Sequence, residues 1–377
     1  MSIVIGADIV PTESNKACFD SGDMQNVVDA GLLNMLSNSD YRIFNLECPL
    51  VDTDSPIRKC GPNLRADVSS VNGLKSIGID LLTLANNHIM DQGNAGLEST
   101  IKALEKENIA FLGVGKNRET AAKPFVFSVN DKKIGVYACA EHEFSIASEN
   151  ISGANPFDPL ESFDHVLSMK KQCDYVIVLY HGGKEYYCYP SPFLQKVCRK
   201  FVEKGADLVV CQHSHCIGCE EKYMSGTIVY GQGNFVFESC KNPMAGTSIL
   251  IIIDKLNDVS YVPLVKSGNG VYLASDEEKK QILSDFYMRS EQIKKIGFIE
   301  SEYSKFAKKM LNSYLQHCSG YYHKIWQRIL NKICKHKLSN HFGIKSYKEN
   351  ELLALQNFIE CESHRELLVE GLKHEKK

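Results

Sequence analysis

Short apolar runs of β type alternate with amphipathic helical stretches over roughly the first 265 residues, and this alternation is the strongest constraint on the fold. In the stretch 95–107, Leu97, Ile101 and Leu104 recur at the spacing of one helix face. Such alternation is typical of an α/β architecture. Because GTIVYGQGNFVF has the pattern of a β-hairpin, we expect mixed sheets. The predicted strands are Ile3–Gly6, Ile43–Leu46, Leu81–Leu84, Ala110–Leu112, Phe125–Val129, Lys133–Ala138, Tyr175–Tyr180, Leu208–Cys211, Thr227–Tyr230, Thr247–Ile253 and Ser260–Leu264.

From about Asp276 the sequence becomes rich in lysine and glutamate and shows helical periodicity. We therefore predict two domains, residues 1–270 and a helical C-terminal region at 271–377. A basic stretch, Lys324–Lys337, also carries apolar residues at helical spacing, namely Ile325, Trp326, Ile329 and Ile333. For this stretch we favour a packed helix with a solvated face over a helix that docks on a partner or a membrane surface.

Charge and hydropathy limit the partners. The chain has 377 residues, of which 44% are hydrophobic and 24% charged, and its net charge is -3 with a pI of about 6.5. This balance does not favour binding to nucleic acid. No apolar run reaches the length of about 18 residues that a membrane span needs, and Asp8 interrupts the apolar start, so we expect neither a membrane span nor a signal peptide.

The chain contains fourteen cysteines. Without an export signal we expect them to be reduced thiols in a cytoplasmic protein. Cys211, Cys216 and Cys219 lie close together in the sequence, but a structural zinc needs four ligands and no clean second C-x-x-C pair exists. A structural zinc is therefore not expected, and the sequence is compatible with a homo-oligomer without determining the oligomeric state.

Polar residues follow five of the predicted strands near the point where each strand ends. In open α/β sheets, sites form at the carboxyl ends of strands, so these side chains are expected at one edge. A single polar residue at such a position is usually part of a turn, but five in order are hard to attribute to turn chemistry. The residues are Asp8, Glu47, the Asn86-Asn87-His88 stretch with Asp91, His181, and His213 with His215.

These residue types favour a metal centre. Carboxylate, amide oxygen and neutral imidazole together form a ligand set for a divalent ion, with manganese, zinc, iron and magnesium all compatible. A carboxylate can also bridge two ions about 3.5–4 Å apart, an arrangement that stabilises both the attacking and the leaving oxygen. The sequence therefore predicts one or two divalent ions as the cofactor.

The same segments resemble the CapA family, which is named for poly-γ-glutamate capsule synthesis, within the calcineurin-like metallophosphoesterase superfamily. The resemblance covers roughly residues 1–265 and rests on GADIVPTESN, FNLECPLVD, LANNHIMDQGNAGLEST, VLYHGGKEYYCYPSP, GADLVVCQHSH and IVYGQGNFVF. It implies a four-layer α/β/β/α sandwich with a two-metal centre on one rim. In this chain a C-terminal helical appendage would follow that sandwich.

The resemblance also implies the ligands position by position. Glu47 matches the bridging carboxylate between the two metals. The remaining matches are Asp8 and His215 for the first metal, and Asn87, His181 and His213 for the second.

One position departs from the superfamily pattern. A histidine commonly stands two residues after the first aspartate, and here that position is Val10, which cannot bind metal. The first metal would then depend on Glu13, Asn15 or water in place of that histidine.

The resemblance further implies a role for His88, which matches a histidine that contacts the scissile group without binding metal. Such a group can protonate the leaving group. Asp91 is placed to orient His88, and a cap on the following helix is an equal alternative for it.

Five further residues are candidates for substrate binding. Lys59 and Arg65 lie in the loop PIRKCGPNLRA, and their cations can hold a phosphate or carboxylate. Lys184 and Glu185 follow His181 in a glycine-rich loop, and Asn234 matches a recurrent position of the family. For each of them the alternative is an ordinary loop or hairpin residue.

Three functions remain open. The first is a metal-dependent hydrolase or transferase that acts on an amide or peptide-like bond of a polymer, in capsule or surface-glycan biosynthesis, as the resemblance implies. The second is a metallophosphoesterase that cleaves a phosphate ester. The third is a non-catalytic assembly factor in polymer synthesis, which is suggested by Val10 in place of a metal-binding histidine. The expected partner is a small-molecule or polymer substrate.

Overall fold

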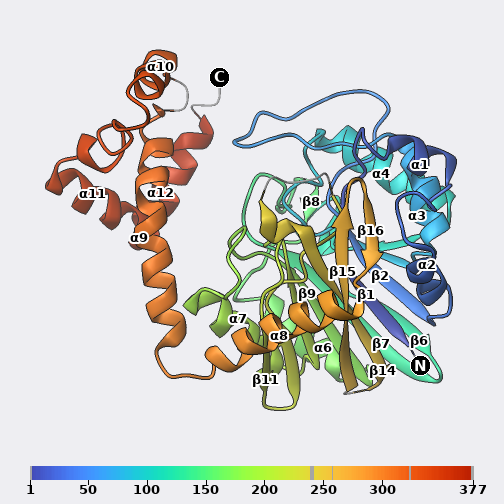
Figure 1. The fold of residues 1–377 in the computed structure, drawn as a ribbon. Coiled ribbons are helices and arrows are strands. Elements are labelled where there is room, and N and C mark those ends of the chain that lie inside the picture. Colours follow the sequence, from blue (N-terminus) through green and yellow to red (C-terminus); the bar gives the residue numbers. More distant parts are fainter. Residues whose placement is uncertain (1, 238–241, 257, 322–323, 375–377) are drawn as a thin grey trace. The chain divides into compact units, whose positions relative to one another are not determined.

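A computed structural model describes residues 2–237, 242–256, 258–321 and 324–374. The chain divides into two compact units, Met1–Ile299 and Glu300–Lys377. Figure 1 shows the strands gathered in the first unit, and the second unit consists of helices.

The larger sheet of the first unit runs in the order β16-β15-β14-β1-β2-β3-β4, with β13 also paired to β1. Strands β1, β2, β3 and β4 are parallel to one another, whereas β14, β15 and β16 are antiparallel to their neighbours. The sheet is therefore mixed, as expected. Its strands are β1 (Ile3–Ile9), β2 (Tyr41–Leu46), β3 (Leu81–Thr83), β4 (Ala110–Leu112), β13 (Asn234–Val236), β14 (Thr247–Lys255), β15 (Asp258–Ser267) and β16 (Gly270–Leu273).

A second sheet runs in the order β11-β12-β10-β9-β7-β6. Its central strands β7, β9, β10 and β12 are parallel. Two very short strands, β5 (Val114–Gly115) and β8 (Gly153–Ala154), form a separate pair. The strands of the second sheet are β6 (Phe125–Val129), β7 (Lys132–Ala140), β9 (Tyr175–His181), β10 (Leu208–Gln212), β11 (Glu220–Tyr223) and β12 (Gly226–Val229).

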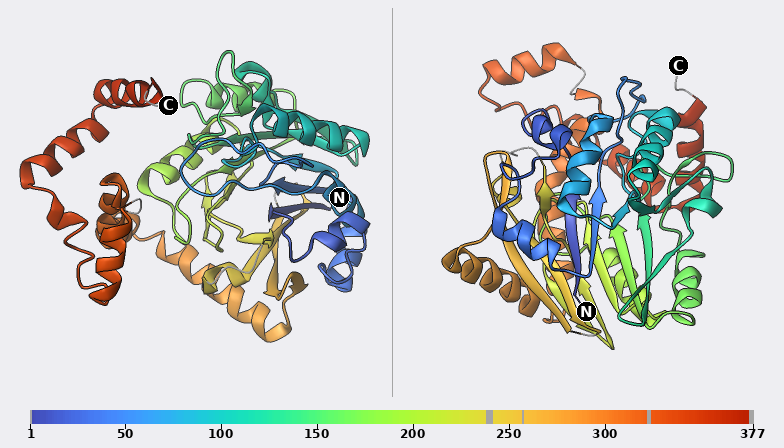
Figure 2. Two further views of the ribbon diagram at one scale, coloured as in Figure 1. Left: turned by 90° about the horizontal axis from the view of Figure 1, so that it is seen from above. Right: turned by 90° about the vertical axis from the view of Figure 1, so that its right-hand side faces the viewer.

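The two sheets pack face to face, and helices cover their outer faces (Figure 1, Figure 2). In β1, Ile3 and Ile5 point into the core between the sheets, while Val4 faces the helices, because side chains alternate along a strand. This arrangement confirms the four-layer α/β/β/α sandwich. The covering helices are α1 (Lys16–Ser21), α2 (Ala30–Ser37), α3 (Val71–Ile77) and α4 (Gly93–Lys106) on the larger sheet, and α6 (Ser162–Lys170) and α7 (Pro192–Glu203) on the smaller one.

The prediction that GTIVYGQGNFVF forms a β-hairpin is wrong. Strand β12 pairs with β10 and β11 in the smaller sheet, whereas β13 pairs with β1 in the larger sheet. The connection passes from one sheet to the other through Gly231 and Gly233, whose φ angles of 130° and 80° favour glycine. The hairpin in this region is instead formed by β11 and β12, and β11 was absent from the predicted strands.

Helix α8 (Asp276–Gln292) belongs to the first unit. Its Phe286 is fully buried in the core between the sheets, and Ser290 Oγ accepts a hydrogen bond from the backbone N–H of Glu220 in β11. The compact unit therefore extends beyond residue 270, where the sequence predicted the boundary between two domains.

The second unit is helical. It contains most of α9 (Phe298–Cys318), followed by α10 (Ile325–Ile333), α11 (Glu349–Glu360) and α12 (Glu362–His374). Among the residues that the structure describes, no helix combines the length and the apolar character needed to cross a bilayer.

Candidate metal centre

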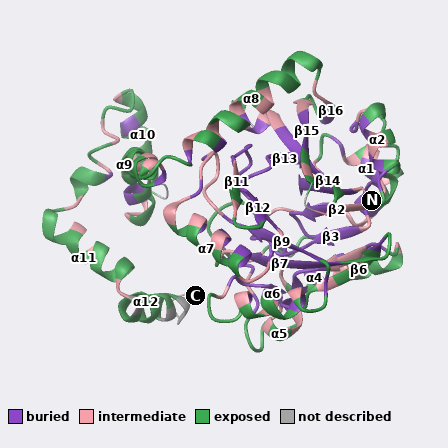
Figure 3. Ribbon diagram, turned by 90° about the horizontal axis from the view of Figure 1, so that it is seen from below, coloured by how far each residue is buried: buried purple, intermediate pink, exposed green. Residues whose placement is uncertain are grey.

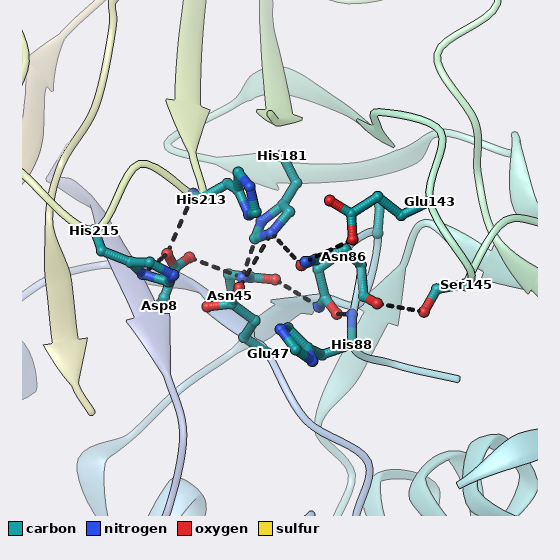
Figure 4. A network of polar contacts seen from close by, with 12 residues as sticks. Asp8, Asn45, Glu47, Asn86, His88, Glu143, Ser145, His181, His213 and His215 are labelled. Carbon is teal, nitrogen blue, oxygen red and sulfur yellow. Dashed lines mark hydrogen bonds and ion pairs between the residues drawn. The ribbon is translucent and has the colours of Figure 1, made fainter. Parts of the chain in front are cut away.

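The register of parallel strands brings the predicted ligands to one edge of the sandwich (Figure 4). Asp8 lies near the end of β1, paired with Asn45 of β2 on one side and Asn234 of β13 on the other. His181 is the last residue of β9 and lies beside Gln212, the last residue of β10. Carboxyl ends from both sheets therefore meet at a single site, as sheets of this type allow.

The structure brings all six predicted metal ligands together. Candidate ligand atoms of Glu47, His213 and His215 lie within 4.8 Å of one another, and the three residues are buried. Nε2 of His181 lies 3.0 Å from Oδ1 of Asn87 and 3.2 Å from Oε1 of Glu47. Donor atoms from four separate segments thus converge on one small volume.

Asp8 joins the same cluster and is fully buried. Its Oδ1 accepts a hydrogen bond from Nδ2 of Asn45 at 2.8 Å, and its Oδ2 accepts one from the backbone N–H of His213 at 3.3 Å. The same Oδ2 lies 3.8 Å from Nδ1 of His215.

Several buried polar atoms in this cluster have no hydrogen-bond partner. Within the described part of the chain, neither carboxylate oxygen of Glu47 accepts a hydrogen bond, and Nδ1 of His213 has no partner. Buried polar atoms are almost always paired, because leaving one unpaired costs on the order of 1–3 kcal/mol. A divalent cation satisfies such oxygen and nitrogen lone pairs, so the residues present fit a bound metal.

Burial also keeps two of the imidazoles in the form that binds metal. Burial lowers the pKa of His181 to about 4 and that of His213 well below its usual value. Both rings are therefore neutral at pH 7, with a lone pair for a cation. For His215, burial acts in the same direction, but the charges of Glu47 and Asp8 outweigh it and raise the pKa.

The carboxyl group of Glu47 is held in an unfavourable environment. Burial, together with the negative charge of Asp8, raises the pKa of Glu47 to about 8. Two buried carboxylates close together repel each other unless a cation lies between or beside them. A divalent ion would remove this repulsion, in agreement with the unpaired oxygens.

The backbone that presents His213 and His215 has an uncommon conformation. Their φ angles are 82° and 51°, in the left-handed region that residues with a side chain rarely adopt. Such strain costs on the order of 1–3 kcal/mol per residue and tends to occur at functional sites. Here it accompanies a turn that places both imidazoles in the same cluster.

Beside the cluster, His88 forms a dyad with Asp91. Oδ2 of Asp91 lies 2.6 Å from Nδ1 of His88 and accepts a hydrogen bond from the backbone N–H of Leu64 at the same distance. Asp91 is fully buried and contacts the His88 ring, so the structure fits the orienting role better than a helix cap. With Nδ1 engaged by Asp91, Nε2 of His88 is left for the site.

Lys59, which the sequence suggested as a loop cation for substrate binding, is buried beside the dyad. Its side chain is only 2% exposed, and its Nζ forms an ion pair with Oδ1 of Asp91 and lies 3.2 Å from Nδ1 of His88. The cation therefore pairs with the dyad on the Nδ1 side of His88, and its contact with a substrate stays a prediction.

Arg65 lines a cavity of about 510 Å³ formed by the loop after Asp8 and the loop that ends at Ser70. Its guanidinium forms ion pairs with Asp54 and Asp67, and Lys16 lines the same cavity. The cavity also includes Leu64, which hydrogen-bonds to Asp91, so it lies close to the dyad.

Lys184 and Glu185 lie in the loop that follows β9. The charge of Glu185 contributes to the raised pKa of Glu47 and of His215, and the charge of Lys184 contributes to the lowered pKa of His213. Both side chains are therefore near enough to act on the cluster. Their contact with a substrate stays a prediction.

Asn234 is 2% exposed, and its Oδ1 lies 2.8 Å from Nδ1 of His215. This contact holds the ring by its Nδ1 edge, as residues behind metal-binding histidines commonly do. The structure thus connects Asn234 with the orientation of His215, and its predicted contact with substrate is untested.

The proposed substitutes for the missing histidine are not at the cluster. Val10 packs in the core with a 3% exposed side chain, and Glu13 is exposed at the cavity of Arg65. Oδ1 of Asn15 accepts a hydrogen bond from the backbone N–H of Thr12 at 2.8 Å and so closes a local turn. Neither Glu13 nor Asn15 replaces the histidine.

Two residues of the network, Asn45 and Glu143, were missed from the sequence, and Asn86 was named there without a role of its own. Asn45 bonds to Asp8, and Asn86 donates to Oδ1 of Asn45 at 3.0 Å. Glu143 accepts a hydrogen bond from Nδ2 of Asn87 at 3.2 Å, which turns Oδ1 of that amide toward His181. Alternation along a strand places Asn45 on the same face as Glu47, a signal that sequence reasoning can use.

Comparison with known proteins decides the family. The family of bacterial capsule synthesis proteins termed PGA_cap matches residues 2–239. This chain belongs to the PGA_cap family.

Two curated relatives of this PGA_cap protein carry names that refer to capsule biosynthesis or to PGA biosynthesis. The capsule biosynthesis protein CapA of Bacillus anthracis is 32% identical over 212 residues, 54% of this chain and 52% of the relative. The PGA biosynthesis protein CapA of Bacillus subtilis (strain 168) is 31% identical over 209 residues, 53% of this chain and 54% of the relative. The chain therefore spans about half the length of these relatives.

Among solved structures, a phosphatase from Mycoplasma pneumoniae aligns with 71% of this chain and 94% of its own. The TM-score is 0.46 and the identity is 13%.

Proposed function

We propose that this PGA_cap protein is a metal-dependent hydrolase or transferase that acts on an amide or peptide-like bond of a capsule polymer. The observation that carries the proposal is the buried cluster around Glu47, whose two carboxylate oxygens accept no hydrogen bond from the described residues. The neutral rings of His181 and His213 supply nitrogen lone pairs to the same volume. The link to polymer biosynthesis is supported by the names of the two CapA relatives, and the amide bond rests on the resemblance to a family named for poly-γ-glutamate synthesis.

Glu47, Asn87, His181 and His213 would hold one ion, and Asp8 with His215 would hold a second that Glu47 shares. When bound, a divalent ion lowers the pKa of water toward about 7 and polarises the bond that is to be broken.

The remaining chemistry belongs to the dyad. Asp91 Oδ2 contacts Nδ1 of His88, so a proton that His88 donates would be carried at Nε2. A proton held there is available to the leaving group, whether the leaving atom is an amide nitrogen or an ester oxygen. Lys59 keeps the Asp91 carboxylate in place, so that the His88 ring keeps its orientation.

An assay with two chromogenic substrates tests the proposal. Protein loaded with manganese or zinc is given a γ-glutamyl anilide and a bis-aryl phosphodiester in parallel. The proposal expects metal-dependent release of the aniline from the γ-glutamyl anilide. The His88→Ala variant, loaded with metal in the same way, should release far less.

The other outcomes discriminate the alternatives. Cleavage of the phosphodiester alone would contradict the amide proposal and favour a phosphoesterase. Metal-loaded protein that cleaves neither substrate nor purified polymer would favour an assembly factor.

A further inference from the structure

Helix α10 packs on its own unit through a polar face. The side chain of Asn331 is 3% exposed. Its Nδ2 donates to the hydroxyl of Tyr321 at 2.8 Å and to Oγ of Ser339 at 3.1 Å, and its Oδ1 accepts a hydrogen bond from the backbone N–H of Leu338 at 3.2 Å. The inward face of this helix is therefore held by an amide, where a globular helix normally presents aliphatic side chains.

The outward face of α10 is apolar. With 3.6 residues per turn, positions 325, 326, 329, 330 and 333 fall on one continuous face. All five residues at these positions are exposed. The exposed fractions are 64% for Ile325, 83% for Trp326, 45% for Ile329, 48% for Leu330 and 72% for Ile333. Figure 3 shows α10 exposed over most of its length. A contiguous apolar face of this kind commonly marks an interaction site, because exposing it to water is unfavourable.

The surrounding sequence carries strong positive charge. Between Glu302 and Glu349 the chain has ten lysine and arginine residues and no aspartate or glutamate, although the whole chain has a net charge of -3. On and beside α10, Lys324, Arg328 and Lys332 recur every four residues and are exposed along one edge of the apolar face. The apolar face is thus bordered by cations.

Together these features favour one occupant over two others. A second copy of the chain would bring two basic stretches against each other, which costs electrostatic energy. A soluble polyanion would pair with the lysines but leave the apolar face in water. An anionic bilayer surface accepts both features, because apolar side chains enter the acyl boundary while lysine and arginine pair with the head groups.

We propose that α10 is an interfacial helix that docks this protein on anionic lipid membranes, with Trp326 and the isoleucines inserted and the basic edge on the head groups. This reverses the packed helix that the sequence favoured. An exposed tryptophan suits such a position, since an indole ring prefers the boundary between acyl chains and water.

Tryptophan fluorescence provides a direct test, because Trp326 is the single tryptophan of the chain. The full-length protein is mixed with vesicles of phosphatidylcholine alone, or of phosphatidylcholine with phosphatidylglycerol. The proposal expects a blue shift of the emission and co-sedimentation with the anionic vesicles only. Added salt should weaken both, since salt screens the lysine and arginine charges.

Two variants keep the tryptophan and test the two parts of the surface. Ile325→Glu with Ile333→Glu removes apolar contact, and Lys332→Glu removes a cation; each is expected to weaken vesicle binding about tenfold or more. Leu160→Glu is the matched control, because Leu160 is an equally exposed apolar residue of the first unit (83%), and it should bind as the wild type does. Far-UV circular dichroism checks that the helices persist in each variant.

Three results would overturn the proposal. The first is an emission that does not change with anionic vesicles. The second is a blue shift that appears without lipid as the protein concentration rises, which would identify a second copy as the occupant. The third is an equal blue shift with soluble polyglutamate, which would identify a polyanion site.

Discussion

The cluster around Glu47 and the helix α10 depart from the usual distribution of residues in opposite directions. In the first unit, Asp8 and Glu47 are carboxylic acids with no exposure to water. In the second unit, Trp326 and Ile333 are large apolar residues exposed by 83% and 72%. Buried charge and exposed apolar surface are both costly, so each is informative where it occurs.

The two regions differ in the kind of ligand that would offset these free-energy costs. In the first region, both carboxylate oxygens of Glu47 and Nδ1 of His213 have no hydrogen-bond partner among the described residues, and a small cation would supply a partner. In the second region, the exposed apolar face of α10 would be covered by an apolar environment, which a small ion does not provide. The comparison therefore predicts that treatments acting on a metal change the first region and leave the second unchanged.

The largest effect is expected at the dyad. His88→Ala removes the proton donor, so the rate of hydrolysis should fall by about 10²–10⁴-fold. Metal content should stay at the wild-type level, because His88 is not among the predicted ligands. Elemental analysis beside the kinetic assay checks both points, with the exposed His317→Ala of the second unit as the control. Equal activity of His88→Ala and wild type would contradict the role of this residue.

The buried ion pair behind His88 provides the next test. Lys59 and Asp91 have side chains 2% and 0% exposed, so removing one partner leaves the other charged and buried. Lys59→Met or Asp91→Asn alone should lower the free energy of unfolding by about 3–5 kcal/mol. The double variant should recover much of this stability in urea unfolding while activity stays low. Full activity in the double variant would show that Asp91 does not orient His88.

Removal of metal should affect the first unit and leave the second unit unchanged. If the ion is present at about a hundred times its Kd, a chelator should lower the free energy of unfolding of the first unit by about 2.7 kcal/mol. Hydrogen exchange at the amides of β1, β9 and β10 measures this loss. The emission of Trp326, which reports on the second unit, should not change. A chelator that alters both signals equally would break the comparison.

The smallest effect is expected from a change of pH between 6.5 and 8 in the metal-free protein. The pKa of Glu47 is raised from 4.5 to about 8, so the folded state holds this proton more tightly than the unfolded state does. Its contribution to stability is then full below pH 4.5 and is lost as the pH rises toward about 8. The slope is at most about 1.4 kcal/mol per pH unit.

A window above pH 6.5 avoids the opposing slope of His181, and His215, whose pKa is raised, adds to the decline there, so the slope of Glu47 is read from a variant. His181, whose pKa is lowered from 6.5 to about 4, gives the opposite slope only between those two values. Urea unfolding of metal-free wild type between pH 6.5 and 8 should therefore show declining stability, and Glu47→Gln should show less decline. Equal slopes in the two proteins would contradict the raised pKa of Glu47.

Much of the candidate site followed from the sequence because its geometry is local to strand ends. His181 and His213 come directly at the ends of β9 and β10, and parallel strands carry such residues to the same edge. No long-range information was needed beyond the expectation of parallel strands. The convergence of all six predicted ligands has this physical origin.

The errors arose where the sequence pattern does not specify a partner. The alternation in β12 and β13 predicts two strands equally well whether they pair with each other or with different sheets. Lys59 has the same sequence pattern as an exposed loop cation, but the fold closes its loop over Asp91 and buries it. The polar inward face of α10 depends on Tyr321 and Ser339, whose positions periodicity alone does not show.

Metal content of the purified protein tests the central claim most directly. Mass-spectrometric elemental analysis of the wild type and of His213→Ala compares a complete cluster with one that lacks a buried nitrogen ligand. The account predicts one or two equivalents of a divalent metal in the wild type and a large loss in the folded variant. A wild-type protein that retains none, and is not stabilised by added manganese or zinc, would contradict it.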